Sequence, residues 1–502
     1  MIKESVKKYG DYSLEIKFKF RPEPKTRFRK QRKYTVDTYF FLPWGMGVNR
    51  KNYTKKDFYR EINSYIRIDP AKVLLADLVK EENEFSQQLT NAFLNLNIED
   101  KESLDNLEGL MKVYLSVFKK AIKRELRSIN KAGHDKERER ITNRLLANLD
   151  KVIIYFRSLK VHIKSAEKNN EDIVKIYSLG NEYISTIYIK YLFVILQIYN
   201  THITKNAKKI ISQVTERIKE EQTYRYQHNF PSTITEDFNK ENEKLLYRWS
   251  MLSSYINNKL IIATRFDKEN KWLTQFYYSL AAGIAMIFAT SIAFYYNQVF
   301  GNFTIRFFVV LVISYMFKDR IKDWIKELIN YLLKKETYDQ TINIFNEKDQ
   351  ILGEISQGFS FTPENNLPKD IQNARNFKLD NNIEDNSTEK VMHYKGRTKI
   401  DVARLYKLFK NVKIRGVNDV TYFNTSPLLM RMENPETQIM FLNNNDELKN
   451  FKSENVYHIN MVLKYKYLKK TNISKYRIIL NRNGIKKVEK IILDKEKVQN
   501  IK

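Results

Sequence analysis

The sequence predicts a multidomain membrane protein in which soluble parts, built from strands and helices, flank a pair of membrane-spanning helices. Three observations predict this fold class. Residues 273–296 contain no ionisable side chain other than tyrosine, although 29% of the 502 residues are charged. The rest of the chain alternates between the apolar periods of strands and of amphipathic helices. It has only 13 glycines and 9 prolines, which favours long regular elements over loops.

The first unit, residues 1–69, is predicted to contain a β-hairpin and a helix. Apolar residues alternate with charged ones over residues 14–20, and residues 34–42 are rich in aromatic and β-branched side chains, as in paired strands. Thr54 and Asp57 have the spacing of a capping box, which marks the start of a helix.

Residues 70–271 are predicted to form a cytosolic α-helical bundle. No proline occurs between Pro70 and Pro231, and apolar residues such as Leu110 and Val113 recur at helical spacing.

Residues 272–317 are predicted to form a two-helix transmembrane hairpin. As a helix, residues 273–296 would span ~36 Å, enough for a hydrocarbon core of ~30 Å, and tyrosines lie at both ends. The second run, residues 303–317, would span only ~22 Å and contains Arg306. We expect this guanidinium to extend toward the headgroups on the far side; the alternative is that it faces a pore or a partner.

The charges around the hairpin predict its orientation. Lysine and arginine residues flank the two spans, whereas the connection, residues 297–302, contains neither. The positive-inside rule therefore places the N- and C-termini in the cytoplasm. The chain has no cysteine, and its first residues lack the apolar run of a signal peptide. We expect a multi-pass protein of the prokaryotic cytoplasmic (inner) membrane.

The first span contains a stripe of small residues. Alanines that recur every four residues allow two helices to pack closely in lipid. The partner is either the second span of the same hairpin, which we favour, or another subunit. The stripe consists of Ala281, Ala285, Ala289 and Ala293.

Three further parts are predicted after the hairpin. Helical spacing of apolar residues predicts an amphipathic juxtamembrane helix over residues 318–343. Residues 344–390 contain two glycines, two prolines and a polar run, which is typical of a linker. Residues 391–493 are predicted to form a small antiparallel α+β domain, in which Asn483–Gly484 marks a hairpin.

The sequence offers little evidence of catalysis. It contains no phosphate-binding glycine loop and no metalloprotease, hydrolase or EF-hand motif, and none of its six histidines is paired at i, i+4. Neither a metal nor a cofactor is predicted. Arg157 and His162 are separated by four residues on a predicted helix, which resembles the signature of HEPN-type ribonucleases. The resemblance covers these two positions and implies that they act on the scissile phosphate and the 2′-hydroxyl; otherwise they form a plain surface pair.

A basic segment lies between the first predicted strands. Residues 17–33 carry nine basic residues and one carboxylate, with three phenylalanines interleaved. The favoured partner is the anionic headgroups of the lipid bilayer, ahead of nucleic acid and of an acidic protein partner. A solvated basic surface is the alternative. The predicted docking residues are Arg27, Arg29, Lys30, Arg32 and Lys33.

These features predict a membrane-anchored cytosolic scaffold or sensor without enzymatic activity. A membrane-perturbing effector of a toxin or phage-defence system, which would form a homo-oligomer through its hairpin, needs the same parts. A HEPN-like ribonuclease is a third hypothesis and depends on Arg157 and His162 alone.

Overall fold

The computed structural model describes most of the chain. The described residues are 2–21, 31–80, 82–97, 100–163, 171–201, 206–231, 240–258, 260–267, 271–301, 304–334, 338–345, 350–377, 389–408, 414–442, 444, 447–468 and 470–493.

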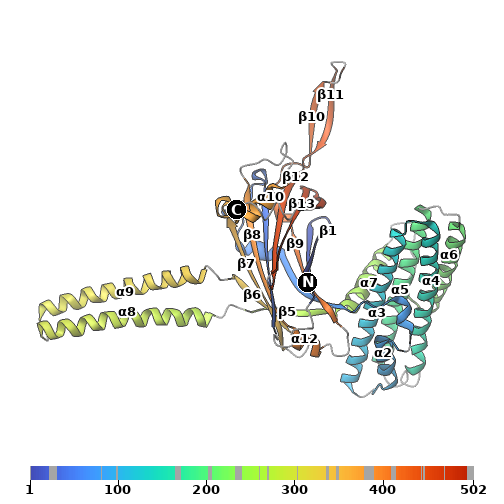
Figure 1. Ribbon diagram of the computed structural model, residues 1–502, viewed down its shortest axis with the longest axis horizontal. Helices are drawn as coiled ribbons and strands as arrows, with labels where there is room; N and C mark the ends of the chain where they lie inside the picture. The colour runs from blue at the N-terminus through green and yellow to red at the C-terminus, as the bar shows by residue number, and fades with distance from the viewer. Residues whose placement is uncertain are drawn as a thin grey trace.

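Twelve strands form one antiparallel sheet at the centre of the molecule, in the order β1-β2-β9-β4-β5-β6-β7-β8-β3-β12-β13-β14 (Figure 1). Short helices lie in its connections, and the first of them starts at the predicted capping box of Thr54 and Asp57. The strands are β1 (Ile2–Tyr9), β2 (Ser13–Phe20), β3 (Gln31–Leu42), β4 (Ile62–Pro70), β5 (Ile261–Asp267), β6 (Gln340–Phe345), β7 (Ile351–Thr362), β8 (Lys390–Asp401), β9 (Ile414–Asn424), β12 (Tyr457–Tyr467), β13 (Lys470–Asn481) and β14 (Gly484–Ile491), and the short helices are α1 (Lys55–Glu61), α10 (Lys369–Asn376), α12 (Val402–Leu408) and α13 (Ser426–Leu429).

The sheet curls so that its two edge strands meet. The amide of Ile485 in β14 donates to the carbonyl of Asp11, just beyond β1, over 2.7 Å, and Lys490 forms an ion pair with Glu4. Gly484, in the turn predicted between β13 and β14, has a φ of 138°. A Cβ there would lie 2.7 Å from the Asp11 carbonyl oxygen, so this turn requires glycine.

The N-terminal and C-terminal strands belong to the same sheet. β2 pairs with β9, and β3 lies between β8 and β12. This differs from the predicted division into a unit of residues 1–69 and a separate domain of residues 391–493. Alternation along a strand identifies its buried face but not its partner, so the sequence pattern could not reveal these pairings.

The segment expected to be a linker, residues 344–390, also contributes to the sheet. It contains β7, which pairs with β6 and β8, and the helix α10. Gly353, which suggested a linker, lies inside β7. A Cβ at this position would lie 2.3 Å from the carbonyl oxygen of Lys399 in β8, so this glycine permits the close approach of two strands.

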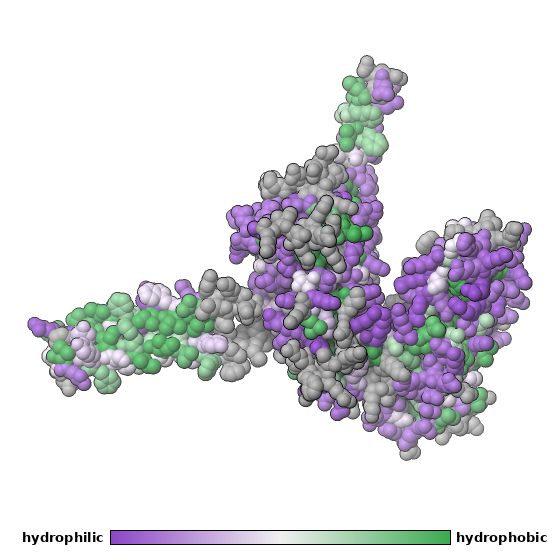
Figure 2. Space-filling model, in the orientation of Figure 1, coloured by the Kyte–Doolittle hydropathy of each residue, from purple (hydrophilic) through white to green (hydrophobic). Residues whose placement is uncertain are grey.

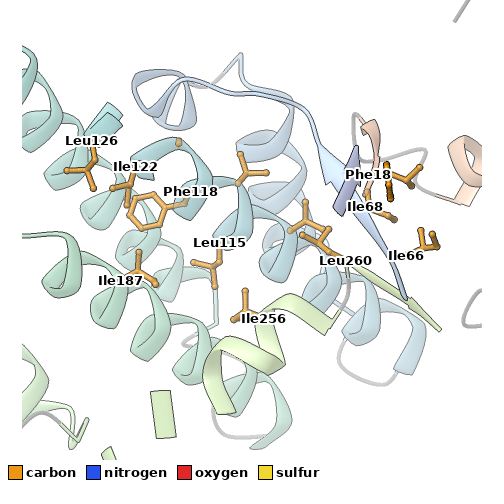
Figure 3. Packing of buried hydrophobic residues seen from close by; sticks show 14 of the residues in the cluster. Phe18, Ile66, Ile68, Leu115, Phe118, Ile122, Leu126, Ile187, Ile256 and Leu260 are labelled. Atoms are coloured by element: carbon orange, nitrogen blue, oxygen red, sulfur yellow. The ribbon is translucent and has the colours of Figure 1, made fainter. Parts of the chain in front are cut away.

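A helical bundle is inserted between β4 and β5 (Figure 1). Its apolar core continues into the sheet, where Leu260 follows Ile256 of α7 and accepts a backbone hydrogen bond from Ile68 of β4 over 2.8 Å (Figure 3). Bundle and sheet therefore share one core at their junction. The bundle helices are α2 (Glu84–Leu94), α3 (Lys101–Lys131), α4 (Asp135–Ser158), α5 (Glu171–Thr201), α6 (Ala207–Gln227) and α7 (Lys240–Asn258).

A second insertion, between β5 and β6, consists of α8 (Lys271–Phe300) and α9 (Ile305–Lys334). The two helices pack side by side and extend away from the sheet on the side opposite the bundle (Figure 1). Within the described part of the chain, one helical segment, Gln275–Val299, is long and apolar enough to cross a membrane. The predicted second span and the start of the predicted helix over 318–343 form one helix, α9, and the end of that range is strand β6.

A two-stranded arm, β10 (Glu436–Leu442) and β11 (Leu448–Glu454), projects from the sheet in another direction (Figure 1). Figure 2 shows its apolar surface. The exposed apolar side chains of the arm are Ile439, Met440, Phe441, Leu442, Leu448 and Phe451.

Candidate functional site

The alanine stripe of α8 faces α9. Ala281 and Ala285 are fully buried, and the hydroxyl of Ser314 in α9 donates to the carbonyl of Ala289 over 3.3 Å. Ala293, nearer the tip, is half-buried. The small side chains therefore allow the two helices of one chain to approach closely.

The alignment of α8 and α9 along their lengths determines how long a stretch of the pair is apolar on both helices. Ser314 lies beside Ala289, and the ammonium of Lys326 lies 5.6 Å from the ring centre of Tyr278. Because the helices are antiparallel, Lys318 lies about level with Ala285, near the middle of α8. From that level to the tip, where the side chain of Arg306 is exposed, both helices are largely apolar over ~22 Å.

The described residues include only part of the predicted basic loop. Arg27, Arg29 and Lys30 lie outside the described residues, and Arg32 and Lys33 lie in β3 rather than in a loop. Arg32 is buried, so its guanidinium is not available to a large anionic surface, whereas Lys33 is exposed. The five residues therefore do not form one continuous loop.

The proposed ribonuclease pair is not arranged as one site. Arg157, at the end of α4, donates to Glu221 of α6 over 2.5 Å, and its guanidinium stacks 3.4 Å from the ring centre of Tyr224. His162 is exposed in the following 3-10 helix, Leu159–Ile163, so the two side chains do not share one face of an α-helix. Arg157 thus has a structural partner, and the geometry does not favour a ribonuclease.

The structure brings together a different group of cations, where the outer face of the sheet meets the bundle. Arg67 of β4 donates to Asn257 of α7 over 2.5 Å, and Asp69 of β4 accepts from Lys120 of α3 over 3.0 Å. Further lysines lie within electrostatic range of these contacts. We call the set the junction cluster: Lys17 of β2, Arg67 of β4, Lys119, Lys120 and Lys123 of α3, and Lys190 of α5.

The junction cluster is electrostatically strained. Burial, together with repulsion from Lys123, Lys190 and Arg67, lowers the pKa of the Lys119 ammonium to about 8. Burial also lowers the pKa of Lys120, although Asp69 opposes the shift. Cations that raise one another's energy in this way are a recognised property of sites that bind anions.

Three buried polar atoms at the junction make no hydrogen bond within the part of the chain that the structure describes. They are Nε of Arg67, Oδ1 of Asn418 and the hydroxyl of Tyr183. Asn418 of β9 pairs with Arg67 across the sheet and is 4% exposed. Tyr183 of α5 is 1% exposed, and its ring centre lies 5.7 Å from the ammonium of Lys119. Buried polar atoms without a partner occur at other places in the described chain too, and ordered water or a ligand can satisfy them.

Tyrosine rings continue along the outer face of the sheet next to the junction cluster. Tyr65 precedes Arg67 by two residues on the same face of β4, which separates them by ~7 Å. Its ring centre lies 5.9 Å from that of Tyr422 in β9, which in turn lies 4.5 Å from that of Tyr9 in β1. The face therefore combines cations with aromatic rings.

A small cavity lies inside the sheet. A cavity of about 20 Å³, lined by residues that include Asp419, Tyr394 and Thr398, has room for one water molecule. Asp419 accepts from the hydroxyls of Tyr34 over 2.6 Å and Thr398 over 3.0 Å, so its carboxylate has partners within the sheet.

A wider groove of about 1140 Å³ opens beside the ends of β3 and β7. Its three cations, Arg50, Lys51 and Lys390, are nearly balanced by Glu364 and Glu389. The junction cluster is the more strongly charged candidate.

Sequence reasoning missed the junction cluster. Lys119, Lys120 and Lys123 occur in a helix as part of an ordinary charged face, and Arg67 is separated from them by about fifty residues of chain. No local pattern indicates that a strand places its outer face against them.

Comparison of the chain with protein-family models, curated proteins and solved structures finds no match.

Proposed function

We propose that this protein is a membrane-anchored sensor or scaffold without enzymatic activity. Its sheet and bundle lie on the cytoplasmic side of the prokaryotic cytoplasmic membrane, and α8 and α9 anchor it as a two-pass hairpin. The Lys and Arg residues that flank the hairpin support this orientation.

The observation that carries the proposal is the position of β5. This strand of seven residues joins the last bundle helix, α7, to the membrane helix α8. It pairs with β4 at two positions and with β6 at five. β5 is therefore the covalent link through which we expect a displacement of the bundle to reach α8, which suits a sensor.

The sheet also supports the two-pass topology. β5 leads into α8, β6 follows α9, and these two strands pair with each other from Ala263 and Phe345 to Asp267 and Thr341. If α8 crosses a bilayer, α9 must return the chain to the same side, because β6 belongs to the sheet from which α8 departs.

The depth of the hairpin sets a condition on this topology. The apolar surface shared by the two helices is ~22 Å long, which is shorter than a typical hydrocarbon core of ~30 Å. The pair can reach the far side if Arg306 and Lys318 extend their aliphatic stems along the helices and place their charges among the headgroups.

Labelling of single cysteines tests the topology, because the chain has no cysteine of its own. Thr304→Cys, at the exposed tip, should react with a membrane-impermeant maleimide on intact cells, and Ile154→Cys, exposed on the bundle, should react only after permeabilisation. Reaction of both positions only after permeabilisation would show that the tip does not cross. Recovery of the full chain in the soluble fraction without detergent would overturn membrane anchoring.

The same mismatch in length favours a second candidate, a membrane-perturbing effector. A hairpin shorter than the bilayer thins it locally or associates with other copies. Regulated expression that collapses the membrane potential would support the effector, and harmless expression would support the sensor or scaffold.

A further inference from the structure

We propose that the junction between sheet and bundle binds a nucleotide, free or within a single nucleic-acid strand, through its phosphate groups. Its use as a signal rests on the proposed sensor function, whereas the binding itself does not.

The charges of the junction cluster select an anion. Six cations from β2, β4, α3 and α5 lie within range of one another's charge, against two carboxylates, Asp69, which pairs with Lys120 over 3.0 Å, and Glu15, which lies near Lys17. The ammonium of Lys119 lies 5.7 Å from the centre of the Tyr183 ring, and the charge of Arg67 acts on the Tyr183 hydroxyl from a longer range. A phosphate group would separate these cations and accept hydrogen bonds from them.

The unpartnered atoms give the ligand a more specific chemistry. Nε of Arg67 and the Tyr183 hydroxyl are donors, which suit phosphate oxygens. Oδ1 of Asn418 is an acceptor and needs a ligand hydroxyl or amino group. A nucleotide supplies both kinds of partner, whereas inorganic phosphate at neutral pH supplies mainly acceptors.

The tyrosines provide a surface for a base. Tyr65 and Tyr422 lie on the same outer face as Arg67, and aromatic rings on a sheet next to cations stack well on nucleobases. The exposed ring of Tyr9, which contacts the ring of Tyr422, extends this surface to β1.

The position of the junction argues against the anchoring membrane as its partner. The bundle lies on the side of the sheet opposite α8 and α9 (Figure 1). Headgroups around the hairpin therefore face another part of the molecule, and the anion must come from solution.

Binding to the full-length protein in detergent tests this proposal, with adenosine triphosphate, inorganic triphosphate and a short single-stranded RNA as probes in phosphate-free buffer. Lys119→Gln and Tyr183→Phe should each weaken binding of the nucleotide or the RNA by about tenfold or more, since each removes a hydrogen bond to a charged group. Lys151→Gln, which removes an exposed cation from α4, should leave binding unchanged.

Tyr183→Phe is the decisive variant. Its hydroxyl has no partner among the described residues, so its removal should not lower the melting temperature, and weaker binding then reflects a lost ligand contact. The probe that binds more tightly identifies the source as a free nucleotide or a nucleic-acid strand.

Three results would overturn the proposal: no saturable binding of any probe, binding that survives both substitutions, or inorganic triphosphate binding as tightly as adenosine triphosphate. These results are independent of the topology experiment. If the protein binds a nucleotide but the Thr304→Cys label shows that the tip does not cross the membrane, the binding site stands and the proposed function as a membrane sensor is wrong.

Discussion

Replacing Lys119 by methionine should stabilise the protein near neutral pH. The folded structure lowers the pKa of this lysine from 10.5 to about 8. That shift corresponds to ~3 kcal/mol by which folding disfavours the charged form. Methionine removes the charge at similar length, and it also removes the attraction between Lys119 and the Tyr183 ring, worth ~1 kcal/mol. We expect a net gain of ~2 kcal/mol at pH 7.

The gain should depend on pH with a defined sign. Unfolded Lys119 titrates near 10.5 and folded Lys119 near 8, so between these values the unfolded chain binds more protons. The wild type therefore gains stability as the pH rises from 8 to 10.5. The variant lacks this contribution, and its advantage should shrink over the same range. The groups that face Lys119 are Lys123 on its own helix, Lys190 and Tyr183 of α5, and Arg67 of β4.

Urea unfolding of the full-length protein in mild detergent, followed by circular dichroism at pH 7 and pH 10 without phosphate, measures both effects. Lys151→Met provides a matched control for loss of an exposed lysine. Two results would refute the electrostatic reasoning. One is a Lys119→Met protein that is less stable than the wild type at pH 7, and the other is a stability difference between variant and wild type that is the same at pH 7 and pH 10.

Three further substitutions test other parts of the structure. Ala285→Leu combined with Ala289→Leu should overfill the contact between α8 and α9 and destabilise the protein by ~1–3 kcal/mol. The melting temperature in detergent should fall, while membrane insertion stays unchanged. An unchanged melting temperature would show that the small side chains are not required. Arg157→Met leaves the buried carboxylate of Glu221 without its partner at 2.5 Å and should lower the free energy of unfolding by ~3 kcal/mol. The double variant that also carries Glu221→Gln should recover this stability. No loss of stability in the single variant would contradict the structural role assigned to Arg157. Phe451→Ser, on the exposed arm, should change the free energy of unfolding by less than ~0.5 kcal/mol, and a larger loss would mean that the arm is covered.

Local chemistry determined the elements that sequence reasoning identified. The capping box at Thr54 depends on two residues three positions apart, and the turn at Asn483–Gly484 depends on glycine at a positive φ. The apolar length of α8 follows from composition alone. Features of this kind are set by neighbours in the chain, so one sequence is sufficient to recognise them.

Only the tertiary structure decided which distant segments meet. The pairing of β2 with β9 spans about four hundred residues, and the two insertions leave no periodic signal that the flanking strands belong together. The same long-range pairing places Arg67 against α3 and creates the junction cluster. Charge repulsion and buried polar atoms without a partner arise only where separate surfaces are brought into contact. No single segment of the sequence therefore reveals them.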